Sequence, residues 1–209
     1  MPAWKRLQRY TPQLGKQANI QIVPEALSQF PKIAEAYSCA LATFARAEFN
    51  ACCVVAEFLG GSRTLQFSLV VERRQVLSGI RNFIKKKSEY QKSRDKSLLS
   101  DKQVKFYNKV AGSLSEFVEA SSVRHWLAHG IIGVSEKNLD KIYIFDPFDS
   151  AVNIDTFLPS SPSVEAEGVI ISEKYLIEFK DDVEKICQKL WELFQEMRDS
   201  EVSKEKNLS

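Results

Sequence analysis

The chain has 209 residues, of which 44% are hydrophobic and 27% are charged, and its formal net charge is +2. This length favours one domain, or one domain with an elaborated insertion, and the composition is that of a globular protein with a sizeable core. A net charge this small excludes a global basic field, so a polyanionic partner would have to bind to a local cluster of cations.

Cysteine usage and the N-terminal sequence bear on the cellular compartment. Cys39, Cys52, Cys53 and Cys187 contain no CxxC pair, so we expect buried thiols in a reducing compartment, not a disulfide framework. The N-terminus lacks the continuous apolar core of a signal peptide, and we expect no stretch long and apolar enough to span a bilayer. The sequence therefore predicts a cytoplasmic protein that does not bind a membrane.

The first 30 residues carry prolines and a glycine between short mixed segments, which predicts an irregular N-terminal arm that packs on the domain or is partly mobile. Pro31 suits the first turn of a helix. From about Ile33 to Leu59 the apolar residues recur at helical spacing and cover nearly the whole circumference, which is typical of a central, buried helix. Gly60 and Gly61 should end it.

A second helix is predicted from Thr64 to about Lys87, followed by a polar, basic stretch that ends near Lys96 and has the composition of a loop. A third helix should begin near Ser100 and Asp101, which are both acceptable N-cap residues. Helical spacing continues from there to the segment Arg124–His129, and the following glycine is a typical helix terminator.

Beyond the third helix the sequence becomes rich in β-forming residues at 141–145 and 168–171, with a loop rich in Pro, Ser and Asp between them. We expect a small hairpin or a partly ordered insertion over about 135–172. A final amphipathic helix is predicted from Lys174 to about Met197. The predicted organisation is an arm over 1–30, a helical domain over 31–198 and a disordered tail over 199–209.

The strongest chemical signal is the segment Arg124-His125-Trp126-Leu127-Ala128-His129-Gly130, which holds both histidines of the chain. Histidine titrates near neutral pH and is a natural proton shuttle. Arginine offers a permanent charge and a planar fork of donors that fits phosphate oxygens. Together they supply what RNA cleavage without a metal needs: a proton acceptor for the ribose 2′-hydroxyl and a cation for the phosphoryl oxygens.

Helix geometry supports this site in part. His125 and His129 are four residues apart and should share a helix face. Arg124 and His129 are five apart, which separates them by roughly 140° on an ideal helix. Distortion at the helix end could bring this pair together, and a second copy of the chain could equally complete the site.

These residues resemble a known family. Arg124, the polar His125, three further residues and His129 are similar to the Arg-polar-x3-His signature of HEPN (higher eukaryotes and prokaryotes nucleotide-binding) domains. The ending Leu-Ala-His-Gly at 127–130 is also common in that family. The resemblance implies a mainly α fold, a HEPN-like helical bundle with the motif at the end of a late core helix. The N-terminal arm and the β-rich insertion are outside the family core.

The resemblance also implies a function. Many such domains are toxins or antiviral effectors that cut single-stranded RNA without metal or cofactor and leave a 2′,3′-cyclic phosphate. They commonly form homodimers with a composite active site, and a toxin would have an antitoxin or another regulatory protein as partner. Arg124 and His129 would then be the essential catalytic pair, and His125 would orient the substrate or His129. An acidic residue on the first core helix assists in some members; Glu48 is the candidate here and Glu57 the second choice.

Other interpretations of the same residues remain open. The alternative function is a non-catalytic HEPN-like module that binds RNA or protein or mediates dimerisation. Arg124 could interact only with the helix dipole, with both histidines at the surface. The His125–His129 spacing also suits a metal, but no His-Glu-x-x-His motif and no third histidine is present, so we predict no metal site.

Three supporting residue groups also have two interpretations. Trp126 could stack on a base, although packing in a core or a dimer interface is the commoner role of a helical tryptophan. Lys85, Lys86 and Lys87 could bind the RNA backbone or belong to a solvated basic loop. Glu48 and its neighbour Arg46 could form ion pairs with neighbouring residues.

Overall fold

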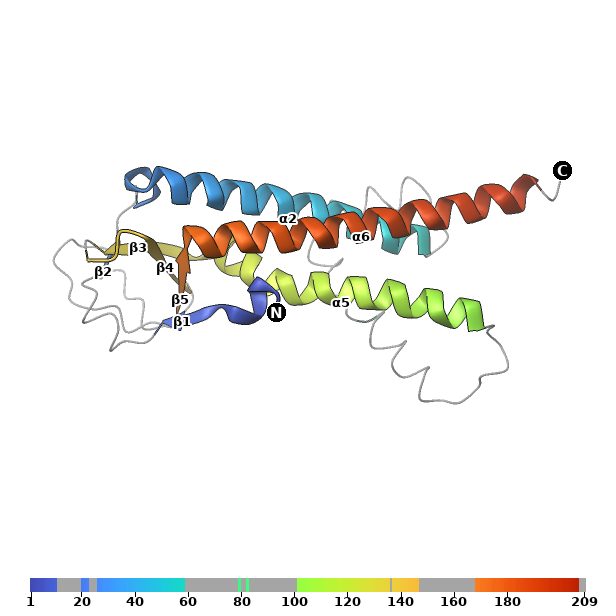
Figure 1. The fold of residues 1–209 in the computed structure, drawn as a ribbon, viewed down its shortest axis with the longest axis horizontal. Coiled ribbons are helices and arrows are strands. Elements are labelled where there is room, and N and C mark those ends of the chain that lie inside the picture. The colour runs from blue at the N-terminus through green and yellow to red at the C-terminus, as the bar shows by residue number, and fades with distance from the viewer. Residues whose placement is uncertain are drawn as a thin grey trace. The chain divides into compact units, whose positions relative to one another are not determined.

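The computed structural model describes residues 1–10, 20–22, 26–58, 79, 82, 101–135, 137–146 and 168–206. Within these ranges the fold is mainly helical, with an antiparallel sheet placed before the last helix (Figure 1). The chain divides into two compact units, one formed by Met1–Thr43 and Ser121–Asp182, the other by Phe44–Ala120 and Val183–Ser209. Each unit contains parts of the three long helices.

The long helices are α2 (Pro31–Phe58), α5 (Asp101–His129) and α6 (Glu173–Lys206). The predicted first and third helices are confirmed, with Pro31 in the first turn of α2 as expected. The predicted last helix is confirmed but too short, because α6 continues past Met197 to Lys206. The added residues are mainly polar and include Glu and Lys, which are good helix formers, so a polar composition did not prevent helix extension.

Burial on α6 follows the apolar stripe that the sequence predicts. The residues that step by three or four along it are all buried: Leu176, Phe179, Val183, Ile186, Leu190 and Phe194. Helix α2 is less uniformly buried than its sequence suggests, since Phe49 is 50% exposed. The prediction that α2 is apolar on every face and central is therefore correct only in part.

In the second unit, contacts among the three helices combine apolar packing with polar pairs. Phe44 of α2 stacks on Phe117 of α5, with ring centroids 5.1 Å apart. The buried Asn50 donates from Nδ2 to the backbone oxygen of Cys187 on α6, at 3.1 Å. Arg46, whose partner the sequence left open, forms an exposed ion pair with Glu184 of α6.

The sheet belongs to the first unit and has the strand order β1-β5-β4-β3-β2. Its three central strands precede α6: β3 (Ile131–Ser135), β4 (Lys141–Phe145) and β5 (Gly168–Ser172). Neighbouring strands are antiparallel, with Tyr143 opposite Ile170 and Ile132 opposite Ile144. Strand β3 was not predicted. Its apolar run is interrupted by Gly133, and glycine is depleted in strands.

The described part of residues 1–30 packs on the domain, as one of the two predicted alternatives has it, but the prediction that this arm is irregular is wrong. Two short 3₁₀ helices, η1 (Ala3–Arg6) and η2 (Ala26–Gln29), accompany two strands, β1 (Gln8–Tyr10) and β2 (Ile20–Ile22). These strands form the two edges of the sheet, β1 beside β5 and β2 beside β3. The arm is thus part of the sheet, because pairing with distant strands satisfies backbone groups that its own proline-containing sequence does not.

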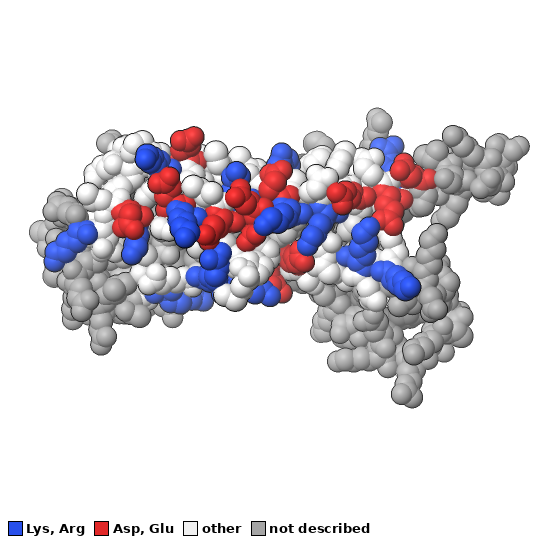
Figure 2. Space-filling view, in the orientation of Figure 1, with Lys and Arg blue, Asp and Glu red and all other residues white. Residues whose placement is uncertain are grey.

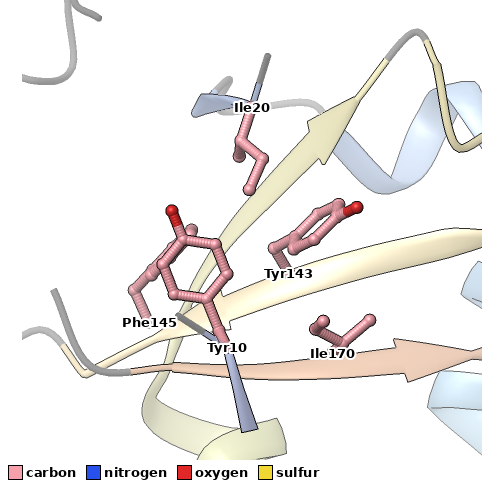
Figure 3. Close-up of a cluster of buried hydrophobic side chains, with 5 residues drawn as sticks. All are labelled: Tyr10, Ile20, Tyr143, Phe145 and Ile170. Carbon is pink, nitrogen blue, oxygen red and sulfur yellow. The ribbon is translucent and has the colours of Figure 1, made fainter. Parts of the chain in front are cut away.

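The expected hairpin over 135–172 is accordingly part of a five-stranded sheet. A cluster of buried side chains lies on one of its faces and comes from four strands, as Figure 3 shows: Tyr10, Ile20, Tyr143, Phe145 and Ile170. The ring of Tyr10 meets that of Phe145 edge-on at 5.0 Å between centroids. Aromatic edge contacts of this kind add to the stability that apolar burial provides.

Two sequence-based expectations are wrong, one about the burial of the cysteines and one about the absence of a membrane-length apolar helix. Cys52, Cys53 and Cys187 are buried free thiols as expected, but Cys39 is exposed. Helix α2 is long and apolar enough to cross a membrane, contrary to expectation; most of its apolar window is buried in the protein, and core helices pass the same test. Two predicted regions lie outside the described residues: the second helix with its basic loop, and the loop rich in Pro, Ser and Asp. Gly79 and Asn82, within the predicted second helix, are described and are helical.

Candidate functional site

Helix α5 ends at His129 because Gly130 makes a close approach to strand β4 possible. The amide of Gly130 donates to the carbonyl oxygen of Trp126 at 2.9 Å, which closes the last turn. A Cβ atom at position 130 would overlap the side chain of Ile144 and lie 2.7 Å from the Trp126 oxygen. Only glycine therefore lets the helix end lie this close to β4 and lead at once into β3.

One face of the last two turns of α5 is anchored in the core of the first unit. Val123 and Leu127 are buried, with exposed fractions of 0% and 2%. The hydroxyl of Tyr37 on α2, which is itself buried, donates to the carbonyl oxygen of Leu127. The last four carbonyls of a helix have no partner within the helix, so this bond satisfies one of them.

The other face of the same turns carries the candidate residues. His125 and His129 are exposed, and Arg124 is half-buried. Nη1 of Arg124 lies 3.1 Å from Nε2 of His129. The two side chains therefore meet within one chain despite their angular separation on an ideal helix, and the long arginine side chain spans the gap. A second copy is not needed to bring this pair together.

The contact between Arg124 and His129 defines a protonation state. A guanidinium group has donors only, so Nε2 must accept the hydrogen bond with its lone pair. This hydrogen bond therefore requires the tautomer of His129 that carries its proton on Nδ1. A neutral imidazole beside a fixed cation is the form that can accept a proton from a hydroxyl group.

His125 lies beside this pair, as the four-residue spacing predicts. The ring centroids of His125 and His129 are 5.3 Å apart, and the rings are tilted by 53°. One small exposed area thus holds a cation, a neutral imidazole and a second imidazole. This set can bind an anion and exchange protons with it.

The remaining predicted residues are placed as follows. Glu48 is buried on the part of α2 that belongs to the second unit, whereas Arg124 and His129 belong to the first. Trp126 is half-buried. Lys85, Lys86 and Lys87 lie outside the described residues. Within the described ranges no three His, Cys, Asp or Glu side chains gather as metal ligands would.

No sequence pattern marks Tyr37 as a residue that contacts the site, because it fits the apolar spacing of α2 as its neighbours do. Its partner Leu127 is 90 positions away along the chain. Burial raises the pKa of the Tyr37 hydroxyl, which keeps it protonated and able to donate. No local sequence pattern connects a tyrosine with a helix end so distant.

Comparisons with protein-family models, with curated proteins and with solved structures gave no match for this chain.

Proposed function

We propose that the protein is a metal-independent endoribonuclease that cleaves single-stranded RNA and leaves a 2′,3′-cyclic phosphate. The observation that carries the proposal is the contact of 3.1 Å between Nη1 of Arg124 and Nε2 of His129 at an exposed helix end. The resemblance of residues 124–130 to the HEPN signature supports it, and so does the place of this segment at the end of a late helix in a mainly helical fold.

In the proposed reaction His129 is the general base. A phosphodiester that binds to Arg124 draws the guanidinium away from Nε2 and leaves that lone pair for the ribose 2′-hydroxyl. The 2′-oxygen loses its proton to His129 and forms a bond to phosphorus, while the bond from phosphorus to the 5′-oxygen breaks. The departing 5′-oxygen takes up a proton, for which His125, whose ring centroid lies 5.3 Å from that of His129, is the proposed donor in its imidazolium form. The step balances because His129 gains one proton and His125 loses one.

Arg124 is the proposed electrostatic catalyst. Two phosphoryl oxygens match the planar fork of a guanidinium group, and negative charge builds on them as the 2′-oxygen attacks. The half-buried position of Arg124 strengthens its field compared with that of a fully solvated cation. No metal is required, because arginine supplies the positive charge and histidine the proton acceptor.

The resemblance extends the proposal to the biological context. We propose a cytoplasmic toxin or phage-defence effector that acts as a homodimer, in which two copies of the segment 124–130 face a shared cleft. An antitoxin or another regulatory protein would be its further partner.

The test is cleavage of a single-stranded RNA in EDTA by the wild type and by Arg124→Ala, His129→Ala and Arg124→Lys variants. Each alanine variant should lower kcat by a factor on the order of 10² to 10³, which is typical for loss of an essential electrostatic or proton-transfer group. Lysine keeps the charge but loses the fork, so Arg124→Lys should also cut slowly. Lys174→Ala, which removes a cation that is 86% exposed, should cut as the wild type does.

The substrate provides a second control. RNA with a 2′-O-methyl group at the cleaved position should resist, and the products from unmodified RNA should carry a 2′,3′-cyclic phosphate. Intact RNA after incubation with folded wild-type protein, over a varied set of sequences, would contradict the proposal.

The alternative, a non-catalytic binding or dimerisation module, is favoured by apolar side chains at the surface of the second unit. Phe49 on α2 is 50% exposed and Trp191 on α6 is 43% exposed. Large aromatic side chains at a surface are typical of interfaces. Binding of RNA or self-association that is weakened by Trp191→Ala, unchanged by His129→Ala and not accompanied by cleavage would support this function instead.

A further inference from the structure

The two side chains of the candidate pair come from successive turns at the end of α5, and His129 stands in the last turn. Arg124 and His129 lie on either side of Leu127, and their contact joins residues that an ideal helix would place roughly 140° apart. Any change in this turn therefore alters the distance between the two side chains. What holds the turn in place is thus as important for the site as the pair itself.

Besides the regular hydrogen bonds within the helix, two further bonds contribute to holding the turn. One comes from the chain itself, from the Gly130 amide to the Trp126 oxygen, at 2.9 Å. The other comes from a different helix, from the Tyr37 hydroxyl to the Leu127 oxygen. Leu127 is 2% exposed and Tyr37 is 9% exposed, so water has little access to replace the second bond.

We propose that Tyr37 is a positioning residue: its hydroxyl fixes the Leu127 carbonyl and thereby holds Arg124 and His129 in contact. This inference rests on the proposed function for its catalytic consequence, but the geometric part stands on the described contacts alone. Without the hydroxyl, the Leu127 carbonyl loses its donor, the last turn loosens, and the time during which Arg124 contacts Nε2 of His129 falls.

The test compares Tyr37→Phe with Tyr175→Phe. Tyr175 lies on α6 in the same unit, and its buried hydroxyl has no hydrogen-bond partner among the described residues, so its removal is a matched control. The first measurement is the ring-nitrogen NMR spectrum of protein labelled with ¹⁵N-histidine. Since the chain has two histidines, His125→Asn assigns the signals, and Arg124→Ala gives the spectrum of His129 without the contact.

Tyr37→Phe should move the His129 signals from the wild-type position toward that of Arg124→Ala, and Tyr175→Phe should leave them in place. A His129 spectrum in Tyr37→Phe identical to the wild type would overturn the proposal. So would an equal displacement in both tyrosine variants. Should Tyr37→Phe fail to fold, a variant with 4-aminophenylalanine at position 37 replaces it, because the amino group restores a donor. The His129 signals of this variant should match those of the wild type. Signals at the position found in Arg124→Ala would overturn the proposal.

The second measurement is RNA cleavage. Tyr37→Phe should lower kcat about tenfold and leave KM within about a factor of two, because misplacement of reacting groups slows the chemical step more than it weakens binding. The 4-aminophenylalanine variant should recover most of kcat. If the wild type cuts no RNA, the proposed function fails, while the NMR comparison still decides whether Tyr37 positions the pair.

Discussion

At the scale of single residues, the candidate site depends on the combination of reactive side chains with one glycine. Arg124 and His129 supply the chemistry, and Gly130 lets the helix that carries them end against strand β4. A short Arg-x4-His pattern is common by chance, so its weight comes from this local geometry. The hydrogen bond between them requires a lone pair on Nε2 of His129, a condition that the sequence could not specify.

We predict that Gly130→Ala destabilises the protein by about 1–3 kcal/mol, because the new methyl group would overlap Ile144 and crowd the Trp126 oxygen. Gly112 lies within α5 and has no atom within 4 Å of a Cβ position. Gly112→Ala should therefore stabilise by up to about 1 kcal/mol, since alanine is the better helix former. Urea denaturation of both variants measures the difference, and equal free energies of unfolding for the two would contradict this account of Gly130.

At the scale of elements, the sheet brings strands from the first 30 residues together with the strands that follow the segment Arg124–Gly130. Strand β3 begins directly after Gly130, and β4 contacts that glycine through Ile144 and Phe145. Strands β1 and β2, from the first 30 residues, close the two edges. The sheet is thus the support on which the end of α5 is packed, and the cluster around Tyr10 and Tyr143 belongs to this support.

We predict that stability falls as the pH rises from about 10 to 12. Burial raises the pKa of Tyr10 to about 12, with a further contribution from Tyr143, so the fold keeps the neutral phenol. The unfolded chain loses these protons near pH 10. A raised pKa in the folded state gives stability that is fully present below the unfolded value and lost as the pH rises toward the folded value.

In Tyr10→Phe the free energy of unfolding should fall less steeply with pH. The substitution removes a group that ionises at a lower pH in the unfolded chain than in the folded protein. Phe44→Leu disturbs the apolar contact with Phe117 in the second unit without removing an ionisable group, and it should keep the wild-type pH dependence. Denaturant unfolding at pH 9, 10 and 11 checks both. A Tyr10→Phe protein that loses stability with pH as steeply as the wild type would show that Tyr10 does not hold its proton more tightly when folded.

At the scale of the whole molecule, charge is balanced. The net charge is +2, and on the face drawn in Figure 2 the cations and carboxylates alternate. Exposed ion pairs such as Lys109–Glu196 and Lys189–Glu116 use several of the cations in the second unit. A nucleic acid would therefore depend on a few cations, and the run Lys85, Lys86 and Lys87 remains the predicted backbone contact.

We predict that replacing Lys85, Lys86 and Lys87 by serine weakens RNA binding and makes it less sensitive to salt. Each phosphate contact to a single strand contributes about 0.7 to the slope of log K against log salt, so the slope should fall by roughly 2. Serine at Lys32, Lys105 and Lys174 removes the same charge and is the control. Titration of labelled RNA at several salt concentrations gives both slopes, and equal slopes for the two triple variants would exclude a specific role for the lysine run.

Local patterns were sufficient for the helices and for the place of the motif. The spacing of apolar residues located α2, α5 and the start of α6 to within a few residues, and the glycine after His129 marked the end of α5, because helix periodicity and termination are properties of neighbouring residues. The same patterns missed β3, the edge strands of the N-terminal segment and the extension of α6. Strand pairing satisfies backbone groups between distant segments, and no local pattern records it.

The residues of the candidate site were thus determined by the sequence itself: Arg124, His125 and His129 stand together on one short segment. Their arrangement was decided only by the tertiary structure. Five residues of separation point two side chains apart on an ideal helix, yet Arg124 and His129 are 3.1 Å apart. The helix end that carries them lies against β4 and accepts a hydrogen bond from the hydroxyl of Tyr37. The distance between two reacting groups depends on packing between segments that are distant in the sequence. Composition and residue spacing carry no information about that packing.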